Sequence, residues 1–433
     1  MLCIYALGME HRKYKLRDIA TVEISGVDKK IKDGEASVKL CNFVDVYYNW
    51  AITSEMGNNF MEATARSNEI ERFKLKKGQV AITKDSETRF DIGIATYIAD
   101  DFDNVILGYH NALITPNPEK LNGKYLNALL HTDYARKYFA NNASGSGQRY
   151  ALSVDALNDF PVPLIPLEEQ IRIGNIFSSI DQKIALNRAI NDNLEAMAKQ
   201  LYDYWFVQFD FPNEEGKPYK SSGGKMIWND KLKRQIPEGW HCGTLLDIAI
   251  YTNGLACQKF RPTDENKLPV IKIKEMHDGI SPDTEFVKSD IPEAVKVYDG
   301  DVLFSWSASL EVTLWAHGDG GLNQHIFKVT SKNNYPRSFY FYQLIDYIGN
   351  FKRMAEARKT TMGHITQDHL KQSTIALPPN ADIANKLEER LLPVFDAIIT
   401  NSQEIMNLTE QRDELLPLLM NGQVSVNYHL SHD

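Results

Sequence analysis

The sequence predicts an α+β protein in which two mixed α/β domains alternate with two long helices that pair as an antiparallel coiled coil. The chain is then an internal duplication with pseudo-twofold symmetry. Residues 143–201 and 357–415 share one plan, from a loop of small polar residues through a proline-rich turn into a long helix. Both helices carry a sustained heptad pattern, and each follows a long stretch of mixed, strand-rich sequence. A chain built twice from one plan suits a target with two parts.

The heptad pattern justifies the helix pairing. Apolar seam residues alternate steps of four and three from Ile173 to Trp205, and the second helix repeats them position for position from Leu387 to Leu419. This spacing keeps one seam facing a partner helix. The central seam positions are Ile180, Ile184 and Asn187 in the first helix and Val394, Ile398 and Asn401 in the second. We expect Asn187 and Asn401 to pair and fix the register, the alternative being that each faces solvent at a frayed seam.

Breaks in the pattern give the domain boundaries. The globular domains are predicted at 1–160 and 240–380, the long helices at 161–206 and 381–422, a linker rich in glycine, proline and charge at 207–239, and a tail at 423–433. Prolines stand before each long helix, and proline is tolerated there but not inside a helix.

Within each globular domain the sequence predicts several short strands and one helix that is separate from the long helices. Strand-like runs lie at Val38–Val46, Gln79–Thr83, Gly93–Ile98, Val270–Ile273 and 298–305, and helices are expected at 124–139 and 338–357. Gly78 and Gly300 read as turns before corresponding strands. His110 and His325 each precede an apolar run, which is a further sign of duplication.

Composition bounds the function. The chain has 433 residues, 43% of them hydrophobic, which is usual for a globular protein of more than one domain. No segment approaches the ~20 apolar residues of a membrane span, and four scattered cysteines show no paired spacing, so we expect a cytoplasmic location. The net charge is −9, but most of the acidic excess lies in the helix segments, so the globular domains could still present a basic face.

Motifs for catalysis were sought without success. The sequence contains no phosphate-binding glycine loop, no dinucleotide-binding glycine pattern, and no metalloprotease or serine-hydrolase motif. The eleven histidines are dispersed, and each is better explained as structural. We therefore predict no catalytic residue, no metal site and no cofactor bound by this chain.

The recurring loops before the long helices are the best candidates for nucleic-acid contact. Glycines allow a backbone to approach a surface closely, and serine, threonine, glutamine, arginine and histidine bond phosphates or base edges. The first loop offers Ser146, Gln148 and Arg149, and the second offers Lys359, Thr360, Thr361 and His364. Segments that follow predicted strands add Lys84, Arg89, Ser305 and Ser307. The plainer interpretation is that these are solvent-exposed surface loops.

These segments resemble a known family. The phrases SGSGQRYALSVDALNDFPVPLIPLEEQ, YWFVQFDFP, YKSSGGKMIWND and IPEGW, together with the repeated order of globular domain and long helix, are similar to the specificity (S) subunit of a type I restriction–modification system. The resemblance covers the whole chain and is most specific at 160–240. The second copy departs from the pattern, because ALPPNADIANK lacks the LEEQ of the first.

The resemblance implies a concrete function. Each globular domain would be a target recognition domain that reads one half of a bipartite DNA site, and the paired helices would set the spacing between the halves. The subunit would be non-catalytic and would dock two methyltransferase subunits and, through them, restriction/translocase subunits. S-adenosylmethionine, ATP and Mg would bind those partners, which methylate adenine and restrict DNA with ATP.

Three other readings remain at this point. An unfamiliar nuclease or methyltransferase would need a cofactor or metal site. A stand-alone, pseudo-dimeric DNA-binding regulator would bind its site tightly without partners. A helical scaffold with no nucleic-acid role would leave the duplicated loops unexplained.

Overall fold

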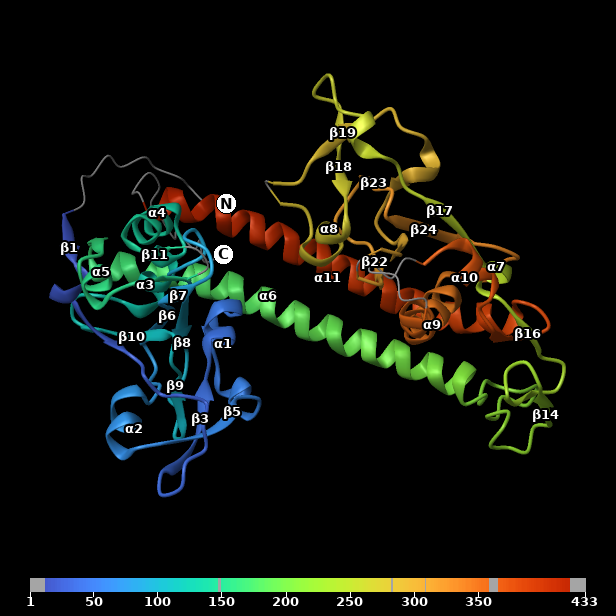
Figure 1. The fold of residues 1–433 in the computed structure, drawn as a ribbon, viewed down its shortest axis with the longest axis horizontal. Helices are drawn as coiled ribbons and strands as arrows, with labels where there is room; N and C mark the ends of the chain where they lie inside the picture. Colours follow the sequence, from blue (N-terminus) through green and yellow to red (C-terminus); the bar gives the residue numbers. More distant parts are fainter. Residues whose placement is uncertain (1–11, 147–148, 282, 308, 358–364, 421–433) are drawn as a thin grey trace, which may run out of the picture. The chain divides into compact units, whose positions relative to one another are not determined.

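The computed structural model describes residues 12–146, 149–281, 283–307, 309–357 and 365–420 (Figure 1). The chain divides into two compact units, residues 1–184 with 408–433 and residues 185–407. Each unit contains a mixed α/β domain and part of both long helices, so the predicted α+β class and the two long helices are confirmed.

The first unit is built around a five-stranded sheet. Its order is β2 (Ala20–Ile24), β10 (Asn111–Pro116), β6 (Val80–Thr83), β8 (Ala95–Ile98) and β4 (Ala51–Ile52). Both faces are covered, because Ala112 and Ile114 belong to one hydrophobic core and Leu113 between them belongs to another. Successive side chains of a strand point to opposite faces, which explains why every residue of β6 is buried.

Smaller elements complete the first unit. A three-stranded sheet has the order β5 (Met61–Ala65), β3 (Ala36–Cys41) and β9 (Val105–Leu107), and a second has β11 (Ser144–Ser146), β12 (Arg149–Ala151) and β7 (Asp85–Ser86). Strand β1 (Lys13–Lys15) pairs with β13 (Pro161–Pro163). The helices are α1 (Phe43–Tyr48), α2 (Ser67–Phe73), α3 (Gly123–Leu130), α4 (Asp133–Asn142) and α5 (Val154–Asn158).

The second unit repeats this topology. Its main sheet has the order β17 (Ala249–Asn253), β24 (Ile326–Ser331), β21 (Val302–Ser305) and β22 (Glu311–Leu314), and its second sheet β19 (Phe286–Lys288), β18 (Lys267–Ile271), β23 (Gly320–Leu322) and β20 (Lys296–Val297). Strand β16 (His241–Gly243) pairs with β25 (Ile375–Leu377) as β1 does with β13. The helices are α7 (Leu245–Ile248), α8 (Ile273–Asp278), α9 (Arg337–Ala357) and α10 (Gln367–Lys371).

Corresponding turns carry the same residues in the two domains. Gly78 and Gly300 precede β6 and β21 and have φ values of 94° and 87°, a conformation that favours glycine. His110 and His325 lie directly before the pair of strands β10 and β24, which occupy the same place in their sheets. The duplication predicted from the sequence therefore extends to the strand order of the domains.

Three predicted elements differ from the structure. The run Val38–Val46 is a strand only in its first part, because Asn42 begins helix α1 with a capping box. The helix expected at 124–139 is two helices, since the Thr132 hydroxyl accepts from the Ala135 amide and starts α4 anew. Within the segment expected as a linker, β14 (Met226–Asn229) and β15 (Arg234–Pro237) form a hairpin that was not predicted.

The long helices are α6 (Leu167–Tyr202) and α11 (Asp382–Met420), drawn green and red in Figure 1. In the second unit they run antiparallel, because the partners of Asn187 and Asn191 on α11 follow in the reverse order. Ile398 is 6% exposed and Val394 packs on the same core. In the first unit Ile184 is 2% exposed, and Ile180 packs on the core that also includes Leu416 of α11.

The polar seam has a different register from the one expected. Asn401 donates from Nδ2 to Oδ1 of Asn191 at 2.9 Å, and Asn187 donates to Oε2 of Glu404 at 2.8 Å. The expected Asn187–Asn401 pair is therefore wrong by about one helical turn.

Each long helix is bonded to its own domain through one polar side chain. Gln170 is 0% exposed; its Oε1 accepts from the Asn122 amide at 2.9 Å, and its Nε2 donates to the carbonyls of Lys120 and Ile165. The second copy lacks this glutamine. One turn further along, Glu388 accepts from the Ser338 amide at 2.8 Å and so serves the same end for α11.

Candidate nucleic-acid interface

In the first unit, strand pairing joins two segments that the sequence proposed separately. Strand β12 pairs with β7, with Tyr150 opposite Ser86 and Ala151 opposite Asp85. The Arg89 guanidinium lies 5.4 Å from the centre of the Tyr150 ring, a cation–π contact. Arg149, the residue before Tyr150 on β12, is exposed. Strand β12 and the segment 84–89 are thus joined by a strand pair and by a cation–π contact.

A charged cluster lies at the base of this surface. Asp85 Oδ2 is 2.8 Å from Lys84 Nζ and 2.5 Å from His110 Nδ1. Burial raises the pKa of Asp85, but the hydrogen bonds from Lys84 and His110 outweigh burial and hold the pKa below its usual value. Much of the charge of Lys84, a predicted DNA contact, is therefore balanced inside the protein.

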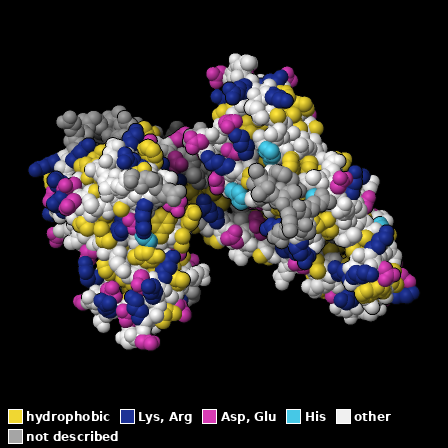
Figure 2. Space-filling model, viewed as in Figure 1, with side chains coloured by type: hydrophobic (Ala, Val, Ile, Leu, Met, Phe, Trp, Pro, Cys, Tyr) yellow, Lys and Arg dark blue, Asp and Glu magenta, His cyan; other side chains and the backbone are white. Residues whose placement is uncertain are grey.

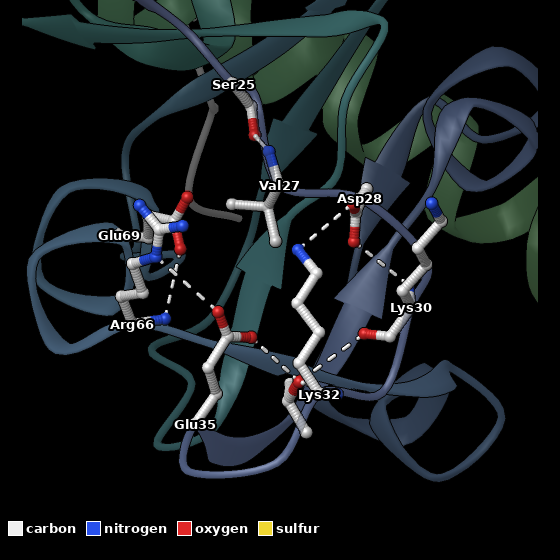
Figure 3. A network of polar contacts seen from close by, with 9 residues as sticks. Ser25, Val27, Asp28, Lys30, Lys32, Glu35, Arg66 and Glu69 are labelled. Carbon is white, nitrogen blue, oxygen red and sulfur yellow. Dashed lines mark hydrogen bonds and ion pairs between the residues drawn. The ribbon is translucent and has the colours of Figure 1, made fainter.

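A lysine-rich loop lies next to the turn that carries His110 and was not predicted from the sequence. Figure 3 shows Asp28, Lys30 and Lys32 of this loop. The Tyr109 amide donates to the Val27 carbonyl at 2.8 Å, and Lys29 Nζ is 5.9 Å from the Tyr109 ring. Asp28 accepts from the Lys30 amide and from Lys32 Nζ, and the first of these bonds is the main reason that its pKa is lowered. The run DKKIKDG, basic and ending in glycine, was the available signal.

The far side of the same loop is held by a second set of bonds. Thr64 Oγ1 accepts from the Lys32 amide and donates to Glu35, which also forms an ion pair with Arg66 (Figure 3). Lys29 and Lys30 remain exposed. An ordered loop backbone with exposed ammonium groups is suited to phosphate contact.

In the second unit the equivalent turn borders a cavity of about 650 Å³. The Gln324 amide donates to the Leu255 carbonyl, as Tyr109 does to Val27 in the first unit. The cavity is lined by polar and basic side chains, among them Gln258, Arg261, Lys272, Lys274, Gln324 and His325. Amide, guanidinium and imidazole groups are those that read base edges in the major groove. Of these side chains, His325 was noted from the sequence as a sign of duplication, and Lys272 lies in the strand expected at Val270–Ile273.

The serines predicted after β21 have a structural role instead. Ser305 is 0% exposed; its hydroxyl bonds the Ser309 carbonyl and accepts from the Glu311 amide at 3.0 Å. Ser307 is 7% exposed. The Ser305 hydroxyl is therefore used within its own loop. The prediction that these serines contact DNA is therefore corrected. Between them lies Trp306, whose ring centre is 5.6 Å from that of His325.

The remaining predicted contacts lie outside, or at the edge of, the residues that the structure describes. Gln148, Lys359, Thr360, Thr361 and His364 fall outside the described residues. Ser146 is the last residue of β11, and only its backbone is described.

The face shown in Figure 2 carries basic and acidic side chains interspersed in both units rather than one broad basic patch. Within the described ranges, no group of three or more histidine, cysteine, aspartate or glutamate side chains could hold a metal ion. No helix in that part of the chain is both long and apolar enough to cross a membrane.

Comparison with known proteins identifies the family. The model of the type I restriction modification DNA specificity domain matches residues 12–196 and 237–410. The type I restriction enzyme MjaIX specificity subunit of Methanocaldococcus jannaschii is 26% identical over 315 residues, covering 70% of this chain and 69% of the relative. The HindI specificity subunit of Haemophilus influenzae is 23% identical over 410 residues, covering 81% and 87%.

A solved structure shares the fold. The type I restriction–modification S subunit of M. genitalium superposes with a TM-score of 0.57 at 12% identity and covers 97% of this chain and 98% of its own. The chain belongs to the family of type I restriction–modification specificity subunits, and it is the subunit that gives such a system its DNA sequence specificity. Specificity subunits are non-catalytic components of these systems, and the comparisons do not support a stand-alone regulator.

Proposed function

We propose that this chain reads a bipartite DNA site, with one half recognised by the domain of the first unit and the other by the domain of the second. The repeated topology supports this assignment: His110 and His325 occupy equivalent turns, but the side chains around them differ. His110 is bonded to Asp85, whereas His325 borders a cavity with Arg261 and Lys272. Two domains that share a strand order but differ in the side chains around this turn can recognise two different half-sites.

In the first domain, Arg149 is the base reader on the described surface. Its neighbour Arg89 is stacked on Tyr150, so the backbone that carries Arg149 is held by β12 and by this contact. Arginine binds guanine O6 and N7 in a bidentate manner. Lys29 and Lys30 supply phosphate contacts, which fix the position of the domain but carry no sequence information. Ser146 and Gln148 complete the set proposed from the sequence.

In the second domain, the cavity beside the Asn323–His325 turn is the reading surface. Gln258 and Gln324 are suited to adenine N6 and N7, and Arg261 to guanine or phosphate. Lys272 is held by Glu285 at 2.7 Å, while Lys274 is exposed. Lys359, Thr360, Thr361 and His364 are the further contacts proposed from the loop before α10.

The helices α6 and α11 set the number of base pairs between the two halves. Their seam fixes one register, and their length is fixed by the chain. We propose that two methyltransferase subunits dock on this chain and that restriction/translocase subunits join through them. S-adenosylmethionine, ATP and Mg then belong to those partners, with adenine methylation and ATP-dependent restriction carried out there in the cytoplasm.

The experiment is methylation mapping of DNA from cells that express this chain with its methyltransferase subunit. A bipartite motif with methyladenine in each half, absent when this chain is omitted, is the expected result. A single-part motif, or a motif that appears without this chain, would overturn the proposal. The matched control expresses the methyltransferase subunit alone.

A further inference from the structure

Phe90 stands out on the surface of the first domain. Its side chain is 83% exposed, the largest value among the big hydrophobic side chains that the structure describes. It lies at the top of the loop between β6 and β8, next to Arg89. A fully exposed phenyl group gains free energy only when another surface covers it.

The base of this loop is closed by backbone bonds. The Gly93 amide donates to the Thr83 carbonyl at 3.1 Å, and the Thr83 amide donates to the Ile94 carbonyl at 2.8 Å. Gly93 has a φ of 81°, and a Cβ there would lie 2.5 Å from the Phe139 ring, so only glycine fits. Ile92 is 2% exposed and belongs to the core. The loop therefore leaves and re-enters the core at fixed points.

The two sides of the apex are also held. On one side Arg89 lies over the ring of Tyr150. On the other, Tyr47 donates its hydroxyl to Asp91 at 2.8 Å, and burial followed by this bond raises the pKa of Tyr47 to about 12. Phe90 thus lies between two residues, Arg89 and Asp91, whose side chains are both held by contacts with other segments.

The surroundings of Phe90 match duplex DNA. Arg89, next to Phe90 in the chain, is exposed, and so is Arg149, next to its ring partner Tyr150. Tyr48, whose ring contacts that of Tyr47, is 73% exposed. Cations bind phosphates, and an apolar side chain between them meets the groove floor. On the major-groove edge the C5-methyl of thymine is the apolar group available to such a side chain.

We propose that Phe90 is a specificity-determining residue that contacts the methyl group of a thymine in the half-site read by the first domain. This inference rests on the proposed function of that domain and assigns one base of its half-site to Phe90. A wedge between base steps is the competing arrangement, and it would kink the duplex instead of selecting thymine.

The test uses duplexes that carry the mapped recognition sequence, with each thymine of that half-site replaced singly by deoxyuridine. Deoxyuridine lacks only the methyl group. Binding is measured for the complex of the full chain with its methyltransferase subunit, as the wild type and as Phe90→Ala. One replacement should weaken wild-type binding about four- to tenfold, the effect of one buried methyl group, and should have no effect on the variant. Phe90→Leu should keep most of the effect.

Other outcomes would overturn the proposal. It fails if the half-site contains no thymine, if wild-type binding ignores every replacement, or if Phe90→Ala weakens binding equally on all duplexes. It also fails if Phe90→Ala prevents assembly with the methyltransferase subunit, because the ring would then belong to a protein contact. Phe286→Ala, which removes a 39% exposed phenyl from the other domain, is the matched control and should leave this half-site unchanged.

Arg149→Ala separates this inference from the proposed function. If Arg149→Ala changes recognition of the half-site and Phe90→Ala does not, only the role of Phe90 is refuted. If neither variant changes it, the assignment of this surface to the half-site is refuted as well.

Discussion

Asn401 and Asn191 form a side-chain hydrogen bond of 2.9 Å in the buried seam between the two long helices. Asn191 also donates to the Ile398 carbonyl at 3.2 Å and to the Ser402 hydroxyl at 3.1 Å. One residue therefore satisfies three groups on the opposite helix. A shift of register would break all three bonds, so the pair favours the observed alignment.

We predict that Asn191→Leu lowers the free energy of unfolding of the full chain by about 1–2 kcal/mol, because it removes three hydrogen bonds and leaves the half-buried Asn401 amide without this partner. The double variant Asn191→Leu/Asn401→Leu should recover most of this loss. Urea unfolding followed by circular dichroism measures both. Asn193→Leu, at an exposed position of the same helix, is the control. Equal stability of wild type and single variant would contradict the account.

Gln170→Ala should destabilise the first unit by about 3 kcal/mol, since it leaves one amide and two carbonyls without their partner. Thermal unfolding of the full chain is the measurement, and Gln200→Ala, exposed on the same helix, should be neutral. If the two variants unfold alike, Gln170 does not lock helix α6 to its domain.

Acid should weaken the first unit through His131. Burial, and then the nearby charge of Arg412, lower the pKa of His131 to about 3, and its ring stacks on Trp50 at 4.2 Å. The folded pKa lies below the unfolded value of about 6.5, so between these values the unfolded chain binds more protons. Stability contributed by neutral His131 is therefore present above pH 6.5 and is lost as pH falls, by at most about 1.4 kcal/mol per pH unit.

The measurement is the free energy of unfolding between pH 7 and pH 4.5 for the wild type and His131→Gln. The variant should show a shallower slope over this interval. The same slope in both proteins would show that His131 is not the group responsible.

The spacer role of the long helices predicts a change in DNA spacing. Removing one heptad from each helix shortens the pair by about 10 Å, which corresponds to about three base pairs of duplex. Methylation mapping should then show a shorter spacer with unchanged half-sites. Removing the heptad from α6 alone misaligns the seam and should abolish methylation. A change in the sequence of either half would argue against the spacer role.

Several parts of this fold could be predicted because local chemistry determines them. The heptad series gave both long helices, and Gly78 and Gly300 marked equivalent turns whose positive φ requires glycine. The capping residue Thr132 could have revealed the break between α3 and α4, but a continuous apolar pattern concealed it. The seam register could not be read from the repeat, because identical spacing is compatible with alignments one turn apart.

The interface was harder to predict than the fold. The pairing of β12 with β7, which joins loop 144–150 to segment 84–89, is a contact between distant parts of the chain and leaves no local pattern. Ser305 looked available because it follows a strand, yet its hydroxyl is used within its own loop. The sequence shows which side chains are polar. Whether a polar side chain can reach DNA depends on its burial in the folded domain, which the sequence does not show.

The central claim is that the two domains read their half-sites independently. Its most direct test replaces residues 1–160 with the matching domain of a relative of different specificity, followed by methylation mapping in cells with the methyltransferase subunit. The account predicts a motif in which one half takes the relative's sequence while the other half keeps its own. A motif changed in both halves, or in neither half despite an assembled complex, would contradict it.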